Sequence, residues 1–142
     1  MKTWLLDTGP LVAYLDANDS AHDSVSGCIE SFTGGLVTTG AVVTEAMYFV
    51  STAPGGPNAL AAFVAASGMR IYDLSQPPEL HAAAELMERY ADTPMYYADA
   101  TLVLLAEALG VRDILTLDRR GFSTYRTRRR RAFNLVLDRA GP

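Results

Sequence analysis

Four acidic residues occupy positions from which a folded chain could gather carboxylates into one site. They are Asp7, Glu45, Asp99 and Asp118. No cysteine or histidine is placed to join them, and a set of oxygen ligands favours a hard cation, Mg²⁺ or Mn²⁺. Without a cation, four close carboxylates would repel each other and raise one another's pKa values. With one, the site could activate a water and stabilise an in-line phosphoryl transition state.

Two threonines stand beside these acids. Thr8 follows Asp7, and Thr116 precedes Asp118 by two residues. Their hydroxyls could hydrogen-bond a carboxylate that holds a metal, or a water bound to the metal. Each acid also has an ordinary structural interpretation, because an aspartate often caps a helix or forms a turn. The hypothesis of a site therefore depends on all four acids converging.

The elements that must position these acids alternate between strands and helices. Short apolar runs predict strands, and runs with helical spacing predict helices. The predicted strands are 3–6, 36–38, 69–73, 114–117 and 133–137, and the predicted helices start near 11 and cover about 19–32, 41–51, 58–66, 79–90 and 96–109, with Gly110 as a helix stop. This order indicates an α/β domain with a short, largely parallel sheet.

A parallel sheet would bring the four acids to the same edge, because ligands bind beyond the carboxyl ends of its strands. Asp7 directly follows the first predicted strand, and Asp118 follows the fourth. Glu45 lies one turn into the helix after the second strand. Asp99 lies in the first turn of the helix that leads to the fourth. We therefore expect one acidic cleft.

The bulk composition is that of one globular domain spanning residues 1–142. The chain is 49% hydrophobic and 20% charged, and no apolar run approaches the roughly 20 residues that span a bilayer. The N-terminus leads straight from Met1 and Lys2 into a strand, which argues against a secretory signal. The single cysteine, Cys28, suits a reducing compartment. These features predict a cytoplasmic protein without a membrane partner.

Positive charge is concentrated near the C-terminus. Residues 1–111 hold thirteen acids and three bases, a balance of −10, whereas residues 112–142 hold nine arginines and three acids, a balance of +6. The candidates for contact with RNA phosphates are Arg119, Arg120, Arg126, Arg128, Arg129 and Arg130, in a run that continues to Arg131. Phe122 and Tyr125 could stack on bases beside them. The alternative is an exposed loop whose charge only aids solubility.

Three segments give the chain a resemblance to a known family. They are LLDTGPLVAYLD at the start, TEAMY in the middle and ADATLVLLAEALGVRDILTLDRRGF near the end. Together they resemble PIN-domain ribonucleases, and most of all the small toxins of bacterial VapBC toxin–antitoxin pairs. The resemblance implies a three-layer α/β/α fold, a Mg²⁺- or Mn²⁺-dependent endoribonuclease, an antitoxin partner and a homodimer.

The family's acidic cluster matches Asp7, Glu45, Asp99 and Asp118, and the metal ligands would be the three aspartates. The sequence departs from the family pattern at Tyr96. Many members carry an additional acid there, so this chain could hold one metal firmly rather than two.

Three other functions share part of this pattern. Asp-Thr-Gly also marks aspartic proteases, but that fold is nearly all β and this chain is mostly helical by pattern. A phospho-acceptor domain would want a late lysine, whereas the only lysine is Lys2. The remaining alternative is a degenerate relative that binds RNA or a partner without cleavage.

Two further patterns concern surfaces. Aromatic residues at helical spacing, including Tyr48 and Phe49, are expected in the core. The alanine-rich stretch around Ala59, Ala62 and Ala66 could pack internally or against a partner helix.

Overall fold

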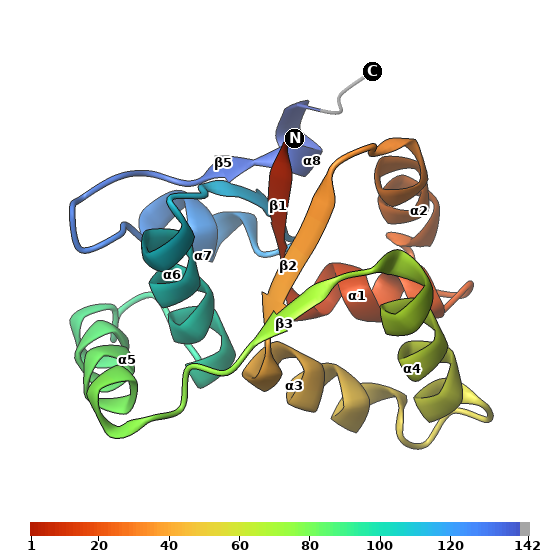
Figure 1. The fold of residues 1–142 in the computed structure, drawn as a ribbon, viewed down its shortest axis with the longest axis horizontal. Helices are drawn as coiled ribbons and strands as arrows, with labels where there is room; N and C mark the ends of the chain where they lie inside the picture. The colour runs from red at the N-terminus through yellow and green to blue at the C-terminus, as the bar shows by residue number, and fades with distance from the viewer. Residues whose placement is uncertain (140–142) are drawn as a thin grey trace.

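The computed structural model describes residues 1–139 and contains a five-stranded parallel sheet in the order β3-β2-β1-β4-β5 (Figure 1). The strands are β1 (Thr3–Leu6), β2 (Gly35–Thr39), β3 (Arg70–Tyr72), β4 (Asp113–Leu115) and β5 (Asn134–Leu135). β1 is central and pairs in parallel with both β2 and β4. The expected α/β class and parallel sheet are therefore confirmed.

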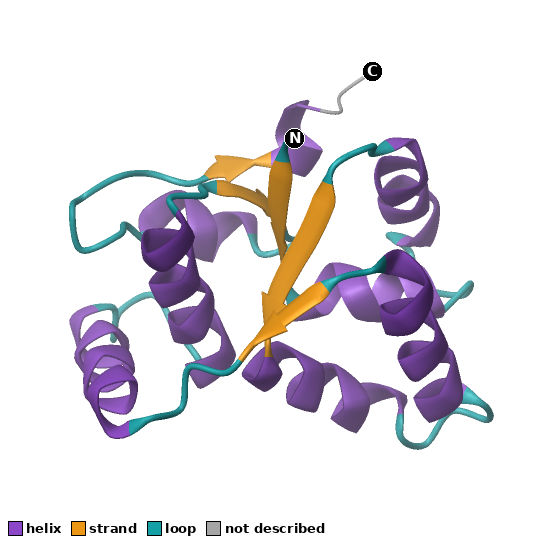
Figure 2. Ribbon diagram, viewed as in Figure 1, coloured by secondary structure: helices purple, strands orange, loops and turns teal. Residues whose placement is uncertain are grey.

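Helices cover both faces of the sheet and make three layers (Figure 2). They are α1 (Thr8–Leu15), α2 (His22–Ser31), α3 (Gly40–Val50), α4 (Gly56–Ser67), α5 (Pro77–Arg89), α6 (Tyr97–Leu109), α7 (Arg119–Thr124) and α8 (Val136–Arg139). In Figure 1, α5, α6 and α7 lie on one side of the strands and α1, α2 and α4 lie on the other. The chain therefore has the three-layer α/β/α architecture that the resemblance to PIN-domain ribonucleases implied.

The hydrophobic core lies between the sheet and the helices that flank it. Leu5 and Leu6 of β1 and Ile114 and Leu115 of β4 are fully buried. Because both faces of a parallel sheet are covered, its central strands are apolar on consecutive residues rather than on alternate ones. Burial of these residues holds β1 and β4 in the core, and Asp7 and Asp118 follow the carboxyl ends of these two strands.

α6 is the most extensively buried helix of the described chain, with eight buried residues from Ala98 to Ala106. It ends at Gly110, which adopts a left-handed conformation with φ of 67°. A non-glycine residue would be strained there, so the predicted helix stop is confirmed. The rigid helix holds Asp99, its third residue, against the centre of the molecule.

The segment after β4 differs from the prediction in two ways. The fourth strand ends at Leu115 rather than at Leu117, because the Thr116 hydroxyl turns to bind Asp7 and the backbone of Asp118. A short helix, α7, follows at once and had not been predicted. The last strand is also shorter than expected, since β5 has only two residues before α8 begins.

Two aromatic residues of α3 are not in the core, contrary to expectation. Tyr48 is 74% exposed and Phe49 is 57% exposed. They pack on each other edge to face, with ring centroids 5.6 Å apart. The alanine stretch of α4 is also exposed at Ala59, Ala62 and Ala66, so its packing against a partner remains a prediction. Within residues 1–139, no helix is long and apolar enough to cross a membrane.

Candidate active site

The candidate site lies where β1 and β4 end side by side. Asp7 follows β1, and its backbone N–H donates to the carbonyl of Leu115 at the end of β4. From β1 the chain passes to β2 and β3 on one side, and it reaches β4 and β5 on the other side only later. The strand order therefore reverses between β1 and β4. Ligands bind at such points in open α/β sheets.

Asp7 is buried and tightly held. One carboxylate oxygen accepts from the N–H of Thr8 at 2.8 Å, and the other accepts from the hydroxyl of Thr116 at 2.7 Å. Burial is the main cause that raises the pKa of Asp7 to about 6; the charges of Asp118 and Glu45 contribute to this rise, and the two hydrogen bonds oppose it. The carboxylate is thus fixed in place but costly to ionise without a cation.

Asp118 is fixed by the same threonine. The Thr116 hydroxyl accepts from the N–H of Asp118 at 3.0 Å, while one Asp118 oxygen accepts from the N–H of Gly121 at 2.9 Å. Asp118 therefore caps α7, as Asp7 caps α1. Thr116 links the two acids through a hydrogen bond to each residue, as its position in the sequence had suggested.

Asp99 approaches from α6. One of its oxygens accepts from the N–H of Tyr96 at 2.9 Å, across the first turn of the helix. Burial, followed by the charges of Asp7, Asp118 and Glu45, raises the pKa of Asp99 to about 7, and the hydrogen bond from Tyr96 opposes this rise. Near neutral pH the metal-free protein should therefore carry a proton on this group for much of the time.

Glu45 completes the acidic group from α3. It is half-buried, and its charge raises the pKa values of both Asp7 and Asp99. Its helix is tied to α6 by a buried hydrogen bond of 2.8 Å between Thr39 and Thr101. These two threonines were not among the predicted site residues, although Thr101 lies in the predicted helix that carries Asp99 and Thr39 stands two residues before the one that carries Glu45.

The four acids fit a divalent cation in the chemistry of their donors. All are carboxylates, and none forms an ion pair with a basic side chain of residues 1–138. The Thr8 hydroxyl beside Asp7 is buried and lacks a hydrogen-bond partner in that part of the chain. No three His, Cys, Asp or Glu side chains of the described residues are already arranged around a metal position. The acids are close enough to interact electrostatically, but among the described residues they do not form a complete set of metal ligands.

The predicted RNA-binding arginines are less uniform than the sequence suggested. Arg119 pairs with Asp138, and Arg128 pairs with Glu107, each at 2.9 Å. Arg126 donates to three backbone carbonyls, those of residues 123, 124 and 125 at the end of α7. Arg120, Arg129 and Arg130 are exposed. Arg126 is therefore committed to the fold, whereas the exposed arginines remain available to a ligand.

The two aromatic residues beside these arginines are buried, so they cannot stack on bases as predicted. Phe122 and Tyr125 are both fully buried and pack edge to face with centroids 5.1 Å apart. The Tyr125 hydroxyl donates to the carbonyl of Pro94 at 2.6 Å. Burial and the charges of Asp99 and Asp118 raise the pKa of Tyr125. This tyrosine therefore ties α7 to the loop that precedes Asp99.

The fold and the sequence together identify the family. The family model of the PIN domain matches residues 4–127. The chain therefore belongs to the PIN-domain family, as the motifs had indicated.

Relatives within this family are known as VapC proteins. The chain is 39% identical over 124 residues to Ribonuclease VapC26 of Mycobacterium tuberculosis. The aligned region covers 86% of this chain and 91% of that relative. It also resembles the crystal structure of Mycobacterium tuberculosis VapC20, a sarcin-ricin loop cleaving toxin. That match has a TM-score of 0.73 and 20% identity, and covers 81% of this chain and 89% of the other.

A second solved structure shares the fold more distantly. It is VapBC2 from Rickettsia felis bound to a DNA fragment from its promoter, with a TM-score of 0.56 and 15% identity over 80% of this chain and 86% of the other.

Proposed function

We propose that this chain is a metal-dependent endoribonuclease that serves as the toxin of a VapBC-type toxin–antitoxin module. The observation that carries the proposal is the placement of Asp7 and Asp118 side by side at the carboxyl edge of a PIN-domain sheet, where the Thr116 hydroxyl bonds to both residues. The extent of identity to a VapC ribonuclease supports the same conclusion. The substrate is RNA, and the bond cleaved is a phosphodiester.

Asp7, Asp99 and Asp118 would hold Mg²⁺ or Mn²⁺, with Glu45 adding negative charge. When bound, the cation supplies an activated water and stabilises charge on the phosphate. The chain's own work is to orient the ligands: Thr116 aligns Asp7, and backbone N–H groups fix Asp99 and Asp118. The unpartnered Thr8 hydroxyl is placed beside Asp7 and could hold a water there.

The biological setting follows from the module. We expect residues 1–142 to act as one PIN-like domain in the cytoplasm, as a homodimer inhibited by a cognate antitoxin. The competing function is a catalytically degenerate PIN-like protein that binds RNA or a partner. Tyr96, which is 67% exposed beside Asp99, is the observation that favours it, because an additional acid could have strengthened metal binding at that position.

Cleavage of a structured RNA pool distinguishes the two. The purified, antitoxin-free protein would be tested with Mg²⁺, with Mn²⁺ and with EDTA, beside Asp99→Asn. We expect cleavage that requires the cation and is lost in the variant, which keeps an oxygen to accept from the N–H of Tyr96. Folded protein that cleaves nothing under any metal would favour the binding-only alternative.

A further inference from the structure

A second recess lies away from the four acids, on the outer side of α6. It is an open groove of about 680 Å³ between α5, α6 and the segment 127–131. Asp99 lies in the first turn of α6, whereas this groove is lined by the second half of that helix, from Leu104 to Gly110. At about 1.5 Å per residue, Glu107 stands roughly 12 Å along the helix from Asp99. The groove is therefore separate from the candidate active site.

The wall of the groove opposite α6 is an arginine hairpin, which we define as residues 126–132. Its ends are joined by an antiparallel bridge between Arg126 and Ala132. The N–H of Arg130 donates to the carbonyl of Thr127 at 2.7 Å, and Arg130 is left-handed with φ of 64°. A turn followed by a left-handed residue is a common short hairpin loop, but glycine or asparagine usually fills that position.

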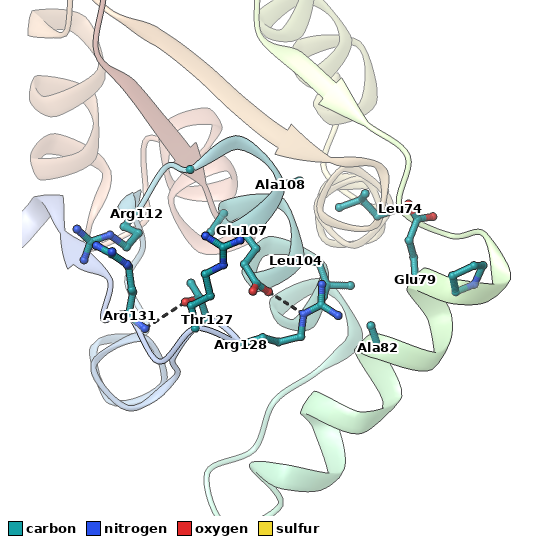
Figure 3. A pocket seen from close by; sticks show the side chains of 14 residues that line it. Leu74, Glu79, Ala82, Leu104, Glu107, Ala108, Arg112, Thr127, Arg128 and Arg131 are labelled. Atoms are coloured by element: carbon teal, nitrogen blue, oxygen red, sulfur yellow. Dashed lines mark hydrogen bonds and ion pairs between the residues drawn. The ribbon is translucent and has the colours of Figure 1, made fainter.

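One arginine of the hairpin anchors it to α6. Arg128 bonds to Glu107 at 2.9 Å, and the Glu107 side chain is only 15% exposed (Figure 3). Figure 3 shows Arg112 and Arg131 together at one end of the groove. Arg112 donates to the carbonyl of Ala132 at 3.0 Å. The hairpin is thus held to α6 through Glu107 and to the segment between α6 and β4 through Arg112.

Two other arginines of the wall are free to bind a ligand. Arg129 and Arg131 line the groove and are exposed, and their guanidinium groups have no hydrogen bond or ion pair to the side chains and backbone that the structure describes up to residue 138. Leu104, Leu74 and Ala82 provide an apolar floor. A guanidinium binds phosphate through paired N–H donors, and an apolar floor suits the face of a base.

We propose that this groove is a remote binding site for single-stranded RNA, in which Arg129 and Arg131 hold a phosphate and the floor takes the neighbouring base. The inference rests on the proposed function, because it extends the RNA substrate from the acids to the far end of α6. Four arginines and two glutamates line the groove, and one glutamate is already neutralised by Arg128. Its surplus charge is positive in a chain whose residues 1–111 carry a balance of −10.

The site would secure a longer RNA while the acids act on one bond. Contacts of this kind are mainly electrostatic, so they should strengthen binding of long chains and weaken with salt.

The test measures binding rather than cleavage. A fluorescent single-stranded RNA with 2′-O-methyl groups, long enough to reach from the acids past Glu107, is titrated by anisotropy into Asp99→Asn protein in EDTA. The Asp99→Asn protein is the parent, and the hairpin variant carries Arg129→Ala and Arg131→Ala in addition to Asp99→Asn. The matched control carries Arg70→Ala and Arg89→Ala in the same background, which removes two exposed charges elsewhere. A dinucleotide serves as the short probe.

We expect the hairpin variant to bind the long RNA roughly tenfold more weakly, with a log–log salt slope smaller by about 0.7 for each phosphate that the two arginines no longer neutralise. The control should stay within about twofold, and the dinucleotide should not distinguish the variants. Equal weakening by both double variants would reduce the effect to net charge and overturn the site.

Two other results would also decide the matter. If the hairpin variant keeps its RNA affinity but loses affinity for the antitoxin, the groove is a protein-binding surface and the RNA site is wrong. If the parent protein binds no RNA in EDTA, or if RNA binding survives both substitutions, the groove proposal is overturned, whereas the nuclease proposal is decided separately by the cleavage assay with Mg²⁺ or Mn²⁺. Circular dichroism checks that each variant is folded.

Discussion

The acids at the sheet edge and the arginines of the hairpin are held in opposite ways. Asp7, Asp99 and Asp118 each accept a hydrogen bond from a backbone N–H at the start of a helix. The exposed arginines Arg129 and Arg131 have no such partner within the described chain. The first group is fixed by the fold, whereas the second is fixed only through the hairpin that carries it.

This contrast separates two kinds of electrostatics. Buried carboxylates in a preorganised site act together, so loss of one should disable the whole. Exposed guanidinium groups act one by one and are screened by salt. The acids should therefore give large effects on the chemical step, and the arginines should give small effects on binding.

The largest expected effect is that of Asp7→Asn. Loss of this charge should reduce metal-dependent RNA cleavage by about a thousandfold or more, since it removes several kcal/mol of stabilisation from the transition state. Stability should rise in EDTA, because the buried charge is removed while the cap on Thr8 is kept. Cleavage rates and urea unfolding would be measured on the same protein. A variant that lost both activity and stability would contradict the expected gain in stability, and Asp7 would then support the fold as well as the chemical step.

The pH dependence of stability tests the same burial. The pKa of Asp7 rises from 3.8 to about 6 on folding, so between these values the folded chain keeps a proton that the unfolded chain has lost. Stability in EDTA should therefore fall as the pH rises through this window, by roughly 3 kcal/mol for Asp7 alone. Asp99, raised to about 7, should extend the fall towards neutral pH.

Urea unfolding at several pH values, with EDTA or with Mg²⁺, would measure this. Bound cation should flatten the curve, because it favours the ionised carboxylates. Stability that increased with pH across the window in EDTA would contradict the burial of these charges.

A smaller effect is expected from Gly121→Ala, which disturbs one acid without removing it. A Cβ at this position would collide with the carboxylate of Asp118 and lie 2.9 Å from the ring of Tyr125. We expect cleavage to fall roughly 10- to 100-fold, as when groups that orient metal ligands are removed. Gly27→Ala is the control, since no atom lies within 4 Å of its Cβ. Equal activity in both variants would show that the position of Asp118 is not critical.

The smallest effect distinguishes arginines within the run. Arg126→Ala should lower the free energy of unfolding by about 1 to 2 kcal/mol, because its side chain bonds to carbonyls at the end of α7. Arg120→Ala should change it by less than about 0.5 kcal/mol, as is usual for exposed residues. Thermal melts of the two variants would measure this. Equal melting temperatures would mean that Arg126 is not structural.

The sequence predicted most of what depends on periodicity. Apolar runs located all five strands, and Gly110 marked the end of α6 because only its backbone tolerates the left-handed turn. Topology then brought Asp7 and Asp118 to one edge, since parallel strands end together. These inferences needed no knowledge of which side chains touch.

The features that were missed depend on side-chain packing between segments far apart in the chain. α7 has only six residues and is begun by the Asp118 cap, so it carries no helical period of its own. Tyr125 was predicted to stack on bases because arginines surround it, yet its ring completes the core beside Phe122. Tyr48 and Phe49 were predicted in the core because their neighbours are apolar. Burial of this kind is set by tertiary packing.

The use of acids as helix caps also bears on how the gene can change. Asparagine caps a helix about as well as aspartate, and the two codons differ by one base. An organism that must silence this protein therefore has a short mutational route to a chain that folds but does not cut. Such a chain would still occupy its antitoxin, so inactive copies could persist in a genome and compete with active ones.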